Sequence, residues 1–501
     1  MPSYYEELLG KAGEIAILQS IISLLQWDLE THMPPSGIDL RKQQLAMLSK
    51  IAHERMSDPE IEMLLNKIDI QNLSEPQRRN VYLIRKNYEE QAKLPEKLIM
   101  EIARQRAATI DIWRKAKAAS DFAMLKPELE KLFELKKQMA HILMEVKVTS
   151  NPYDALIDIY EPKLTADFLN KILKELKRKV LLLVEKYRAT SDTAEAILKL
   201  RIPVDIQRHI VRELAKFLDY DIESNQAWGR IDESEHPFTA GYYQDIRITT
   251  RYREDSFTSS IFSILHEAGH ALYEHSLNPE FMYQPIGTPC SYGFGESQAR
   301  LLENIIGRSR EFWGYFLPKL CKLTGGFLPS LDLNRFLIAI NQIKPSRIRI
   351  EADEVTYNLH IIIRFEIELD LFTEKIEISE LPQVWNEKYL DYLDLKIEND
   401  AEGVLQDIHW ASGHFGYFPS YALGNLYSAQ ILSKLEKEVN WRGQIAMGSF
   451  LGVKKWLIEN VYSYGNLYDP LDLIKKITGE ELSIEYYLNY LKSKYIKLPE
   501  I

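Results

Sequence analysis

Residues 256–272 read SFTSSIFSILHEAGHAL, and this stretch near the middle of the chain has the apolar period of an α-helix. Its apolar residues recur at spacings of three and four and so share one helical face: Ile261, Ile264, Leu265, Ala268 and Leu272. Asp255 or Ser256 can cap the start of this helix. Gly269 lowers helix propensity by about 1 kcal/mol, so its presence indicates close packing or close approach of a substrate.

The segment before this helix has the chemistry of β-strands. Gly229, Pro237 and Gly241 divide residues 227–253 into short stretches, and residues 242–250 (YYQDIRITT) are rich in aromatic and β-branched side chains. We therefore expect a small antiparallel sheet of two or three strands within residues 227–253.

Helical periodicity covers most of the remaining chain, which predicts a mainly helical fold. Residues 8–25 carry one apolar stripe, and the Met33–Gly37 segment (MPPSG) ends that helix. Another helix is predicted to start at Ser74, because Ser74 and Gln77 together can form a capping box. Further helices are predicted to start at Pro95, at Pro127 and at the corner formed by residues 163–165. No Ser- or Gly-rich linker divides the chain, so we expect one domain of two lobes around a deep groove. Its parts are a helical region 1–220, the β insert 227–253, catalytic helices 256–310 and a helical region 311–501.

Composition narrows the class of function. The net charge of −11 argues against nucleic-acid binding, and the basic run at 174–179 (KELKRK) is expected to be a solvated helix face. The chain starts without the pattern of a secretory signal, and its uninterrupted apolar runs are far shorter than the ~20 residues that span a bilayer. Two cysteines, Cys290 and Cys321, fit a reducing compartment. We expect a cytoplasmic protein that binds neither nucleic acid nor membrane.

The sequence His266-Glu267-Ala268-Gly269-His270 predicts a metal site. Residues four apart stand on one helical face, so both imidazoles can bind the same cation. Glu267 lies one step round the helix, where it can accept a proton from a metal-activated water as general base. A catalytic zinc site needs a third protein ligand.

The candidate third ligand is Glu296, in the sequence GFGESQAR at 293–300, which opens another helix 26 residues after His270. Glu303, two turns further on, can orient a metal ligand through a hydrogen bond without binding the metal itself. The alternative is that Glu303 forms a surface ion pair with Arg300. Cys290 is a weaker alternative ligand because it lies in the loop before this helix.

Ordered motifs along nearly the whole chain resemble the carboxypeptidase Taq family, the M32 metallocarboxypeptidases. The segments that carry the resemblance are Trp27-Asp28 with Met33-Pro34, HPF at 236–238, DIRITT at 245–250, HEAGH at 266–270, ESQAR at 296–300, IRIEAD at 348–353 and GVLQDIHW at 403–410. Two positions depart from the family pattern: Gly295 stands where a histidine is expected, and His275 where glutamine is common. We expect His275 to be structural.

The resemblance implies a zinc carboxypeptidase of broad specificity, with cobalt as an alternative metal, that works as a homodimer on peptides with a free C-terminus. Arg349 is expected to bind the terminal carboxylate, with Arg347 as an alternative, and Asp353 to hold the Arg349 guanidinium; a simple i,i+4 salt bridge between Arg349 and Asp353 is the alternative.

Further catalytic roles and rival functions stay open. Donors to the developing oxyanion are expected among His236, His409 and Tyr421. One rival function is an oligopeptidase or dipeptidyl carboxypeptidase that uses the same site. Another is an inactive helical binding protein with a structural metal.

Overall fold

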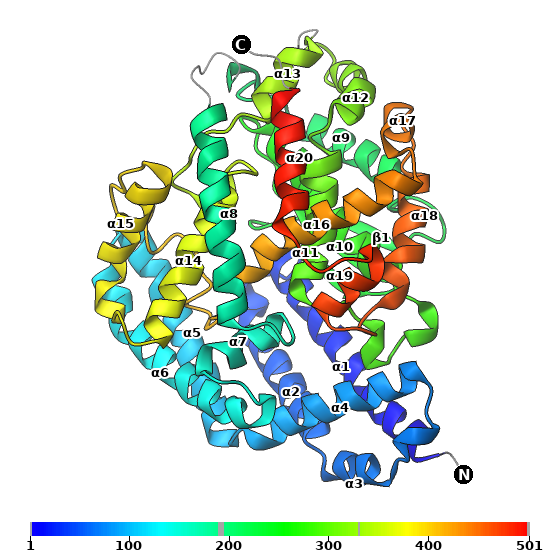
Figure 1. The fold of residues 1–501 in the computed structure, drawn as a ribbon, viewed down its shortest axis with the longest axis vertical. Helices are drawn as coiled ribbons and strands as arrows, with labels where there is room; N and C mark the ends of the chain where they lie inside the picture. The colour runs from blue at the N-terminus through cyan, green and yellow to red at the C-terminus, as the bar shows by residue number, and fades with distance from the viewer. Residues whose placement is uncertain (1–2, 189–194, 329–330, 498–501) are drawn as a thin grey trace.

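The computed structural model describes residues 3–188, 195–328 and 331–497, and within these ranges the protein is mainly helical (Figure 1). The predicted fold class is confirmed. The helices before the sheet are α1 (Tyr4–Thr31), α2 (Ile38–Met56), α3 (Pro59–Lys67), α4 (Glu75–Lys93), α5 (Glu96–Ala119), α6 (Phe122–Lys147), α7 (Pro152–Tyr160), α8 (Ala166–Tyr187) and α9 (Val204–Leu218). Those after it are α10 (Phe257–His275), α11 (Tyr292–Arg300), α12 (Arg310–Leu323), α13 (Leu333–Ile340), α14 (Tyr357–Phe372), α15 (Leu381–Leu393), α16 (Pro419–Glu438), α17 (Trp441–Ala446), α18 (Leu451–Asn460), α19 (Pro470–Thr478) and α20 (Ile484–Ile496).

Short helical turns join these elements. Most are 3₁₀ turns, whereas η6, directly after α11, is a π-helix. Their bounds are η1 (Pro35–Gly37), η2 (Ile70–Asn72), η3 (Glu195–Ile197), η4 (Pro279–Phe281), η5 (Pro285–Gly287), η6 (Leu301–Ile306), η7 (Arg349–Glu351), η8 (Ile378–Glu380) and η9 (Tyr462–Tyr464).

The sheet lies where the sequence predicts it, but its topology is mixed. Its strands are β1 (Gly229–Glu233), β2 (Thr239–Tyr242) and β3 (Asp245–Thr250), in the order β1-β3-β2. β2 and β3 form an antiparallel pair, whereas β1 pairs with β3 in parallel. The antiparallel prediction is therefore wrong for one of the two pairs. The loop after β1 carries the chain to the far edge of the sheet, and β3 returns between the two earlier strands.

Helix starts follow the predicted capping chemistry with two exceptions, one of which is α10: Ser256 is its N-cap residue, but the side chain makes no capping hydrogen bond. Ser74 and Gln77 form the predicted capping box of α4, and Thr165 caps α8. Pro127, however, lies inside α6, which begins at Phe122 because the Asp121 side chain accepts a hydrogen bond from the amide of Ala123. Pro127 is the sixth residue of α6 and has no amide N–H to donate to the carbonyl oxygen of Ala123.

Helix α1 is only partly covered by the rest of the protein. Its predicted apolar stripe includes Leu8, which is fully buried, but also Ile21, which is 40% exposed. The most apolar 18-residue window of α1 has a mean hydropathy of 1.5, and 6% of it is buried. By length and composition alone this helix is apolar enough to cross a membrane. That is weak evidence of a span, because signal sequences and core helices of soluble proteins meet the same criterion.

One side of α1 faces the predicted groove. The groove is a cavity of about 1090 Å³ whose walls come from α1, α4, β2, α10, α11 and the loop between the last two helices. Residues His266, Glu267 and His270 of the motif line this groove, so the fold brings the motif to a place that a peptide-sized molecule can reach.

Two glycines set the spacing of the helices under the groove. A Cβ on Gly269 of α10 would lie 2.5 Å from the Cα of Ala299 on α11. A Cβ on Gly424 of α16 would lie 2.5 Å from the Cγ of Glu296, also on α11. Helix α11 is therefore held between α10 and α16 at a distance that only glycine allows. The close packing predicted at Gly269 is confirmed.

We expect Gly269→Ala to lower stability by about 1–3 kcal/mol through overpacking against α11, although alanine favours a helix by about 1 kcal/mol. The matched control is Gly10→Ala on α1, where a Cβ meets nothing within 4 Å. This control should be neutral or stabilising. Thermal unfolding of both variants checks the prediction, and an unchanged melting temperature for Gly269→Ala would contradict it.

Candidate metal centre

Three side chains from two helices converge at the floor of the groove. His266 and His270 come from α10, and Glu296 comes from the middle of α11. Oε2 of Glu296 lies 3.7 Å from the Nε2 atoms of both histidines, and the three ligand atoms lie within 4.8 Å of one another. Ligands of a tetrahedral zinc ion are about 3.4 Å apart. The donor set and its spacing thus fit a divalent cation between them.

Local sequence positions Glu296 on the ligand side of α11. Ser291 caps this helix by accepting a hydrogen bond from the Phe294 amide, and the Gly293 amide donates to the buried carboxylate of Glu161 at 2.5 Å. These contacts fix the first turn of α11, and Glu296 follows in the middle of the helix, on the side that faces the two histidines of α10. Gly295 leaves open the space beside His270, since a Cβ there would meet only Nδ1 of His270, at 3.8 Å.

A second layer of charged groups orients the ligands. Arg300 donates from Nε to Oε1 of Glu296 at 2.6 Å, which leaves Oε2 to face the histidines. Nδ1 of His266 is 2.9 Å from Oε2 of Glu303, and Arg300 also donates to that oxygen at 3.1 Å. Arg300 and Glu303 are therefore not a surface pair. Glu303 has the geometry of a group that orients a metal-ligating histidine.

The electrostatics of the ligands favour a cation. Burial opposes charge on His266, but Glu296 and Glu303 outweigh it and raise the pKa of His266 to about 9. Burial, together with the neighbouring His266, lowers the pKa of His270 to about 4. Burial also opposes charge on Glu303, but the adjacent Arg300 and His266 lower its pKa to about 2. The carboxylates thus stabilise positive charge at the position where a metal would replace a proton.

Glu267 lies beside the three ligands without joining them. Its side chain is buried, and its Oε2 accepts a hydrogen bond of 2.6 Å from Oγ1 of Thr239 on β2. Burial raises the pKa of this carboxyl. The sequence does not predict that Thr239 belongs to the site, because its contact with Glu267 depends on the packing of β2 against α10.

Arg349 is buried one layer behind the groove wall. It lies in η7 and donates from Nε and Nη2 to Oδ1 of Asp407 at 3.0 and 2.9 Å, and from Nη1 to the Tyr357 hydroxyl at 2.8 Å. The Tyr421 ring, which lines the groove, covers the guanidinium at 5.1 Å. Asp407 also accepts from Arg364, so one buried carboxylate joins two arginines.

Two expectations about the partners of Arg349 are wrong. Asp353 does not hold the guanidinium, and the two residues do not share a helix, because η7 ends at Glu351 and α14 begins at Tyr357. The Asp353 carboxylate instead accepts from the amides of Val355 and Thr356, since it caps the turn that leads into α14. Arg347 is paired with Glu398 at 2.6 Å and is not among the residues that line the groove.

The three candidate oxyanion donors lie in different places. Tyr421 lines the groove, and its hydroxyl is 3.2 Å from Nε2 of His409. His409 is half-buried behind Tyr421, where loss of solvent lowers its pKa to about 3, so its imidazole is neutral. His236 lies in the exposed loop between β1 and β2, and its neighbours Pro237 and Phe238 line the groove instead. The structure thus brings Tyr421 and His409 together and leaves His236 apart.

His275 and Cys290 lie outside the ligand cluster. His275 stacks on Trp228 with ring centroids 3.6 Å apart, and its Nδ1 is 2.7 Å from the carbonyl oxygen of Tyr243. This confirms its structural role. Cys290 is buried at the groove, where burial raises the pKa of its thiol, and it is not part of the cluster of His266, His270 and Glu296.

Comparison with known proteins gives one consistent result. The sequence model of the carboxypeptidase Taq (M32) metallopeptidases matches residues 7–495. Carboxypeptidase 1 of Bacillus subtilis is 37% identical over 504 residues, which cover 99% of each chain. Thermostable carboxypeptidase 1 of Thermus thermophilus is 38% identical over 507 residues, which cover 99% of this chain and 98% of the relative. The crystal structure of an M32 carboxypeptidase from Deinococcus radiodurans R1 superposes with a TM-score of 0.93 at 31% identity, covering 99% of both chains.

We expect His270→Ala to abolish stoichiometric binding of a divalent metal, because it removes one of three ligands. The control is His209→Ala, an exposed histidine on α9. Metal content after dialysis, measured by mass spectrometry, should fall from about one ion per chain to background in His270→Ala and stay unchanged in the control. Full metal retention by His270→Ala would contradict the assignment of these ligands.

Proposed function

The chain belongs to the carboxypeptidase Taq (M32) family of metallopeptidases and is a metal-dependent carboxypeptidase; on that premise we propose that it removes single residues from the C-termini of peptides at the centre formed by His266, His270 and Glu296. The observation that carries the proposal is the position of this cluster. It lies on the floor of a groove large enough for a peptide, with the buried carboxylate of Glu267 beside it.

Glu267 is the general base in this proposal. A divalent cation held by the three ligands would supply Lewis-acid activation of a water molecule and of the scissile carbonyl. The Thr239 hydroxyl occupies Oε2 of Glu267, so Oε1 is the oxygen that takes the proton from the attacking water. The same oxygen then returns the proton to the departing amine. Burial favours this exchange, because it brings the carboxyl pKa closer to neutral.

Arg349 is the proposed anchor for the terminal carboxylate of the substrate. Asp407 holds its guanidinium in place, while the Tyr421 ring separates it from the groove. Substrate binding therefore requires Tyr421 to turn aside. That motion would expose the planar fork that binds both carboxylate oxygens and would bring the Tyr421 hydroxyl toward the reacting carbonyl.

Zinc is the proposed cation, because catalytic zinc sites combine histidine nitrogen with carboxylate oxygen. Cobalt accepts the same ligands and is the alternative. A broad side-chain tolerance, a homodimeric state and a cytoplasmic location complete the proposal. These three points rest on the resemblance and on composition.

One observation favours a second candidate, an oligopeptidase that cuts internal bonds. The groove continues from the metal ligands to α1, and no arginine is among the residues that line it within the described part of the chain. An internal cutter needs no carboxylate anchor. Cleavage of peptides with an amidated C-terminus distinguishes the two functions. A carboxypeptidase does not cleave such peptides, whereas an internal cutter does.

We expect Glu267→Gln to lower kcat by about 10²–10⁴-fold while the metal stays bound, because only the proton acceptor is lost. The matched control is Glu274→Gln, two turns further along α10 and also at the groove. It should keep most of the activity. Steady-state kinetics with metal analysis of each variant checks this, and near wild-type kcat in Glu267→Gln would rule Glu267 out as the base.

We expect Arg349→Lys to raise KM for peptides with a free C-terminus by about 10-fold or more, since an ammonium group cannot form the bidentate contact. Arg347→Lys, a conservative change at an exposed and already paired arginine, should leave KM unchanged. If Arg349→Lys has normal kinetics, or if the wild-type protein cleaves amidated peptides equally well, the carboxylate anchor is wrong.

A further inference from the structure

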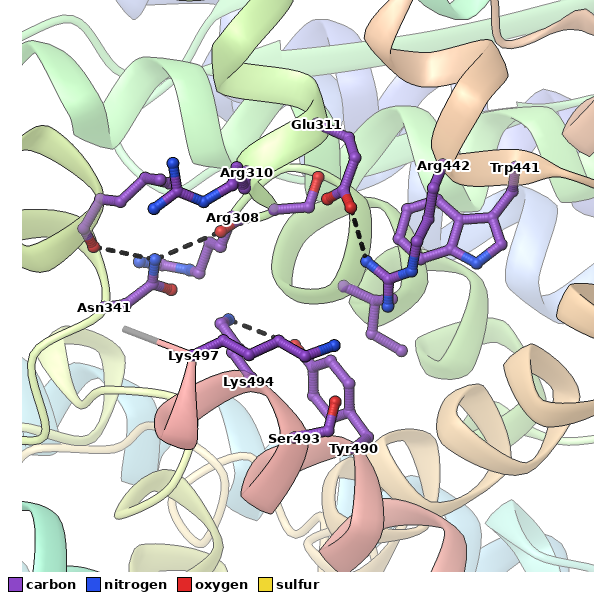
Figure 2. Close-up of a pocket in the computed structure, with 13 residues that line it drawn as sticks. Arg308, Arg310, Glu311, Asn341, Trp441, Arg442, Tyr490, Ser493, Lys494 and Lys497 are labelled. Carbon is purple, nitrogen blue, oxygen red and sulfur yellow. Dashed lines mark hydrogen bonds and ion pairs between the residues drawn. The ribbon is translucent and has the colours of Figure 1, made fainter. Parts of the chain in front are cut away.

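A second cavity lies away from the groove, on the other side of η6. It measures about 160 Å³, is open on one side, and is lined by the chain from η6 into α12, the C-terminal end of α13, α17 and the last turns of α20 (Figure 2). Figure 2 shows side chains from these four segments arranged around an open space. These segments are far apart in the sequence, so folding alone brings them together.

The cavity is rich in positive charge. Five cationic side chains line it against one carboxylate, Glu311, although the chain as a whole has a net charge of −11. The cationic residues are Arg308, Arg310, Arg442, Lys494 and Lys497. Like charges gathered in one cavity repel each other, and an anion placed between them removes that repulsion.

Three of the five cationic side chains are paired with a carboxylate. Arg442 donates to Glu311 at 2.9 Å, Arg308 lies 3.9 Å from Glu303, and Lys494 contacts Glu354. The other two are not. Arg310 donates only to the side-chain oxygen of Asn334, and Lys497 has no carboxylate within 4.0 Å in the described part of the chain. Arg310 and Lys497 therefore supply the uncompensated charge.

The backbone adds to this positive potential. Helix α12 begins at the cavity, and Ser309 caps it by accepting a hydrogen bond from the Phe312 amide. The amides of Arg310 and Glu311 belong to the first turn, which has no preceding helical carbonyl to bond. The positive end of the helix dipole thus points to the same place as the cationic side chains.

Asn341 contributes an unsatisfied acceptor to the wall. Its Nδ2 donates to the carbonyl oxygens of Arg308 and Leu337, at 3.2 and 3.0 Å. Its Oδ1 has no hydrogen-bond partner, although only 4% of the residue is exposed. A buried acceptor without a donor is costly, and a ligand that carries a hydroxyl would satisfy it.

We propose that this cavity binds inorganic hydrogen phosphate. The anion combines multiple negative charge with an O–H group, which matches cationic side chains and open amides on one side and Asn341 on the other. The cavity volume of about 160 Å³ is several times the roughly 30 Å³ that one water molecule takes up, so a small polyatomic anion fits in it. Sulfate lacks the hydroxyl at neutral pH, and a phosphomonoester dianion has an ester group in its place.

Calorimetric titration of the metal-loaded protein with inorganic phosphate, at constant ionic strength, tests the proposal. The variant is Arg310→Gln with Lys497→Gln. Its matched control is Arg335→Gln with Lys492→Gln, which removes the same charge from exposed positions on α13 and α20 outside the cavity. We expect the Kd for phosphate to rise at least about 10-fold in the cavity variant and to change less than about 2-fold in the control.

Two results of the phosphate titration would overturn the proposal. One is the absence of saturable phosphate binding by the wild-type protein. The other is binding that the cavity variant retains in full, which would place the anion elsewhere, for example at the metal. Titration with sulfate and with glycerol phosphate tests the role of Asn341: both should bind at least about 10-fold more weakly than phosphate, and equal affinity would contradict the hydrogen-phosphate assignment. The readout is binding, so it stands apart from the proposed peptidase activity.

Discussion

The hydrogen bond from Arg300 to Oε1 of Glu296 is the contact on which the metal centre depends. It turns the other oxygen toward His266 and His270 and compensates the charge of a carboxylate that is almost fully buried. Without a cationic partner a buried carboxylate neutralises instead of binding metal. The pair forms within α11, between residues four apart, and Gly269 and Gly424 let that helix lie close enough to α10 and α16 for Glu296 to reach the two histidines. Backbone packing and ligand geometry are therefore one constraint.

Buried charge throughout this part of the protein is arranged in chains of alternating sign. His266, Glu303 and Arg300 form one chain behind the metal ligands, and Arg349, Asp407 and Arg364 form another behind Tyr421. In each, one carboxylate contacts two groups: Glu303 contacts His266 and Arg300, and Asp407 contacts Arg349 and Arg364. Such networks add little net stability, but removing one partner leaves an uncompensated charge. Their value here is the fixed orientation of groups that act on a ligand.

Sequence patterns predict those parts of the site that depend on local geometry. The spacing of His266 and His270 follows from the helix period, and the structure places both on one face of α10. Glu296 required the family resemblance, because nothing local distinguishes it from other acidic residues at helix starts. The sequence does not predict the pairing of Arg349 with Asp407, which is 58 residues away. It favours the local residue Asp353 as the partner of Arg349, and that prediction is wrong.

Long-range arrangement accounts for the other differences. The parallel pairing of β1 with β3 depends on the path of a loop, and the strand residues alone do not encode it. The sequence predicts a helix start at Pro127, because proline is common in first turns. In the structure α6 starts earlier, directly after its capping residue Asp121. The basic run at 174–179 lies on α8, while the five cationic residues of the cavity come from three separate segments, at the start of α12, in α17 and at the end of α20. Charge that is assembled by folding leaves no continuous signal in the sequence.

Release of the C-terminal amino acid from an N-blocked dipeptide is the most direct test of the central claim. The assay compares the metal-loaded protein, the protein after complete chelation, and the chelated protein with zinc or cobalt restored. The account predicts single amino acids as the product, loss of activity on chelation and recovery with either metal. Release that continues after metal content has fallen to background would contradict it.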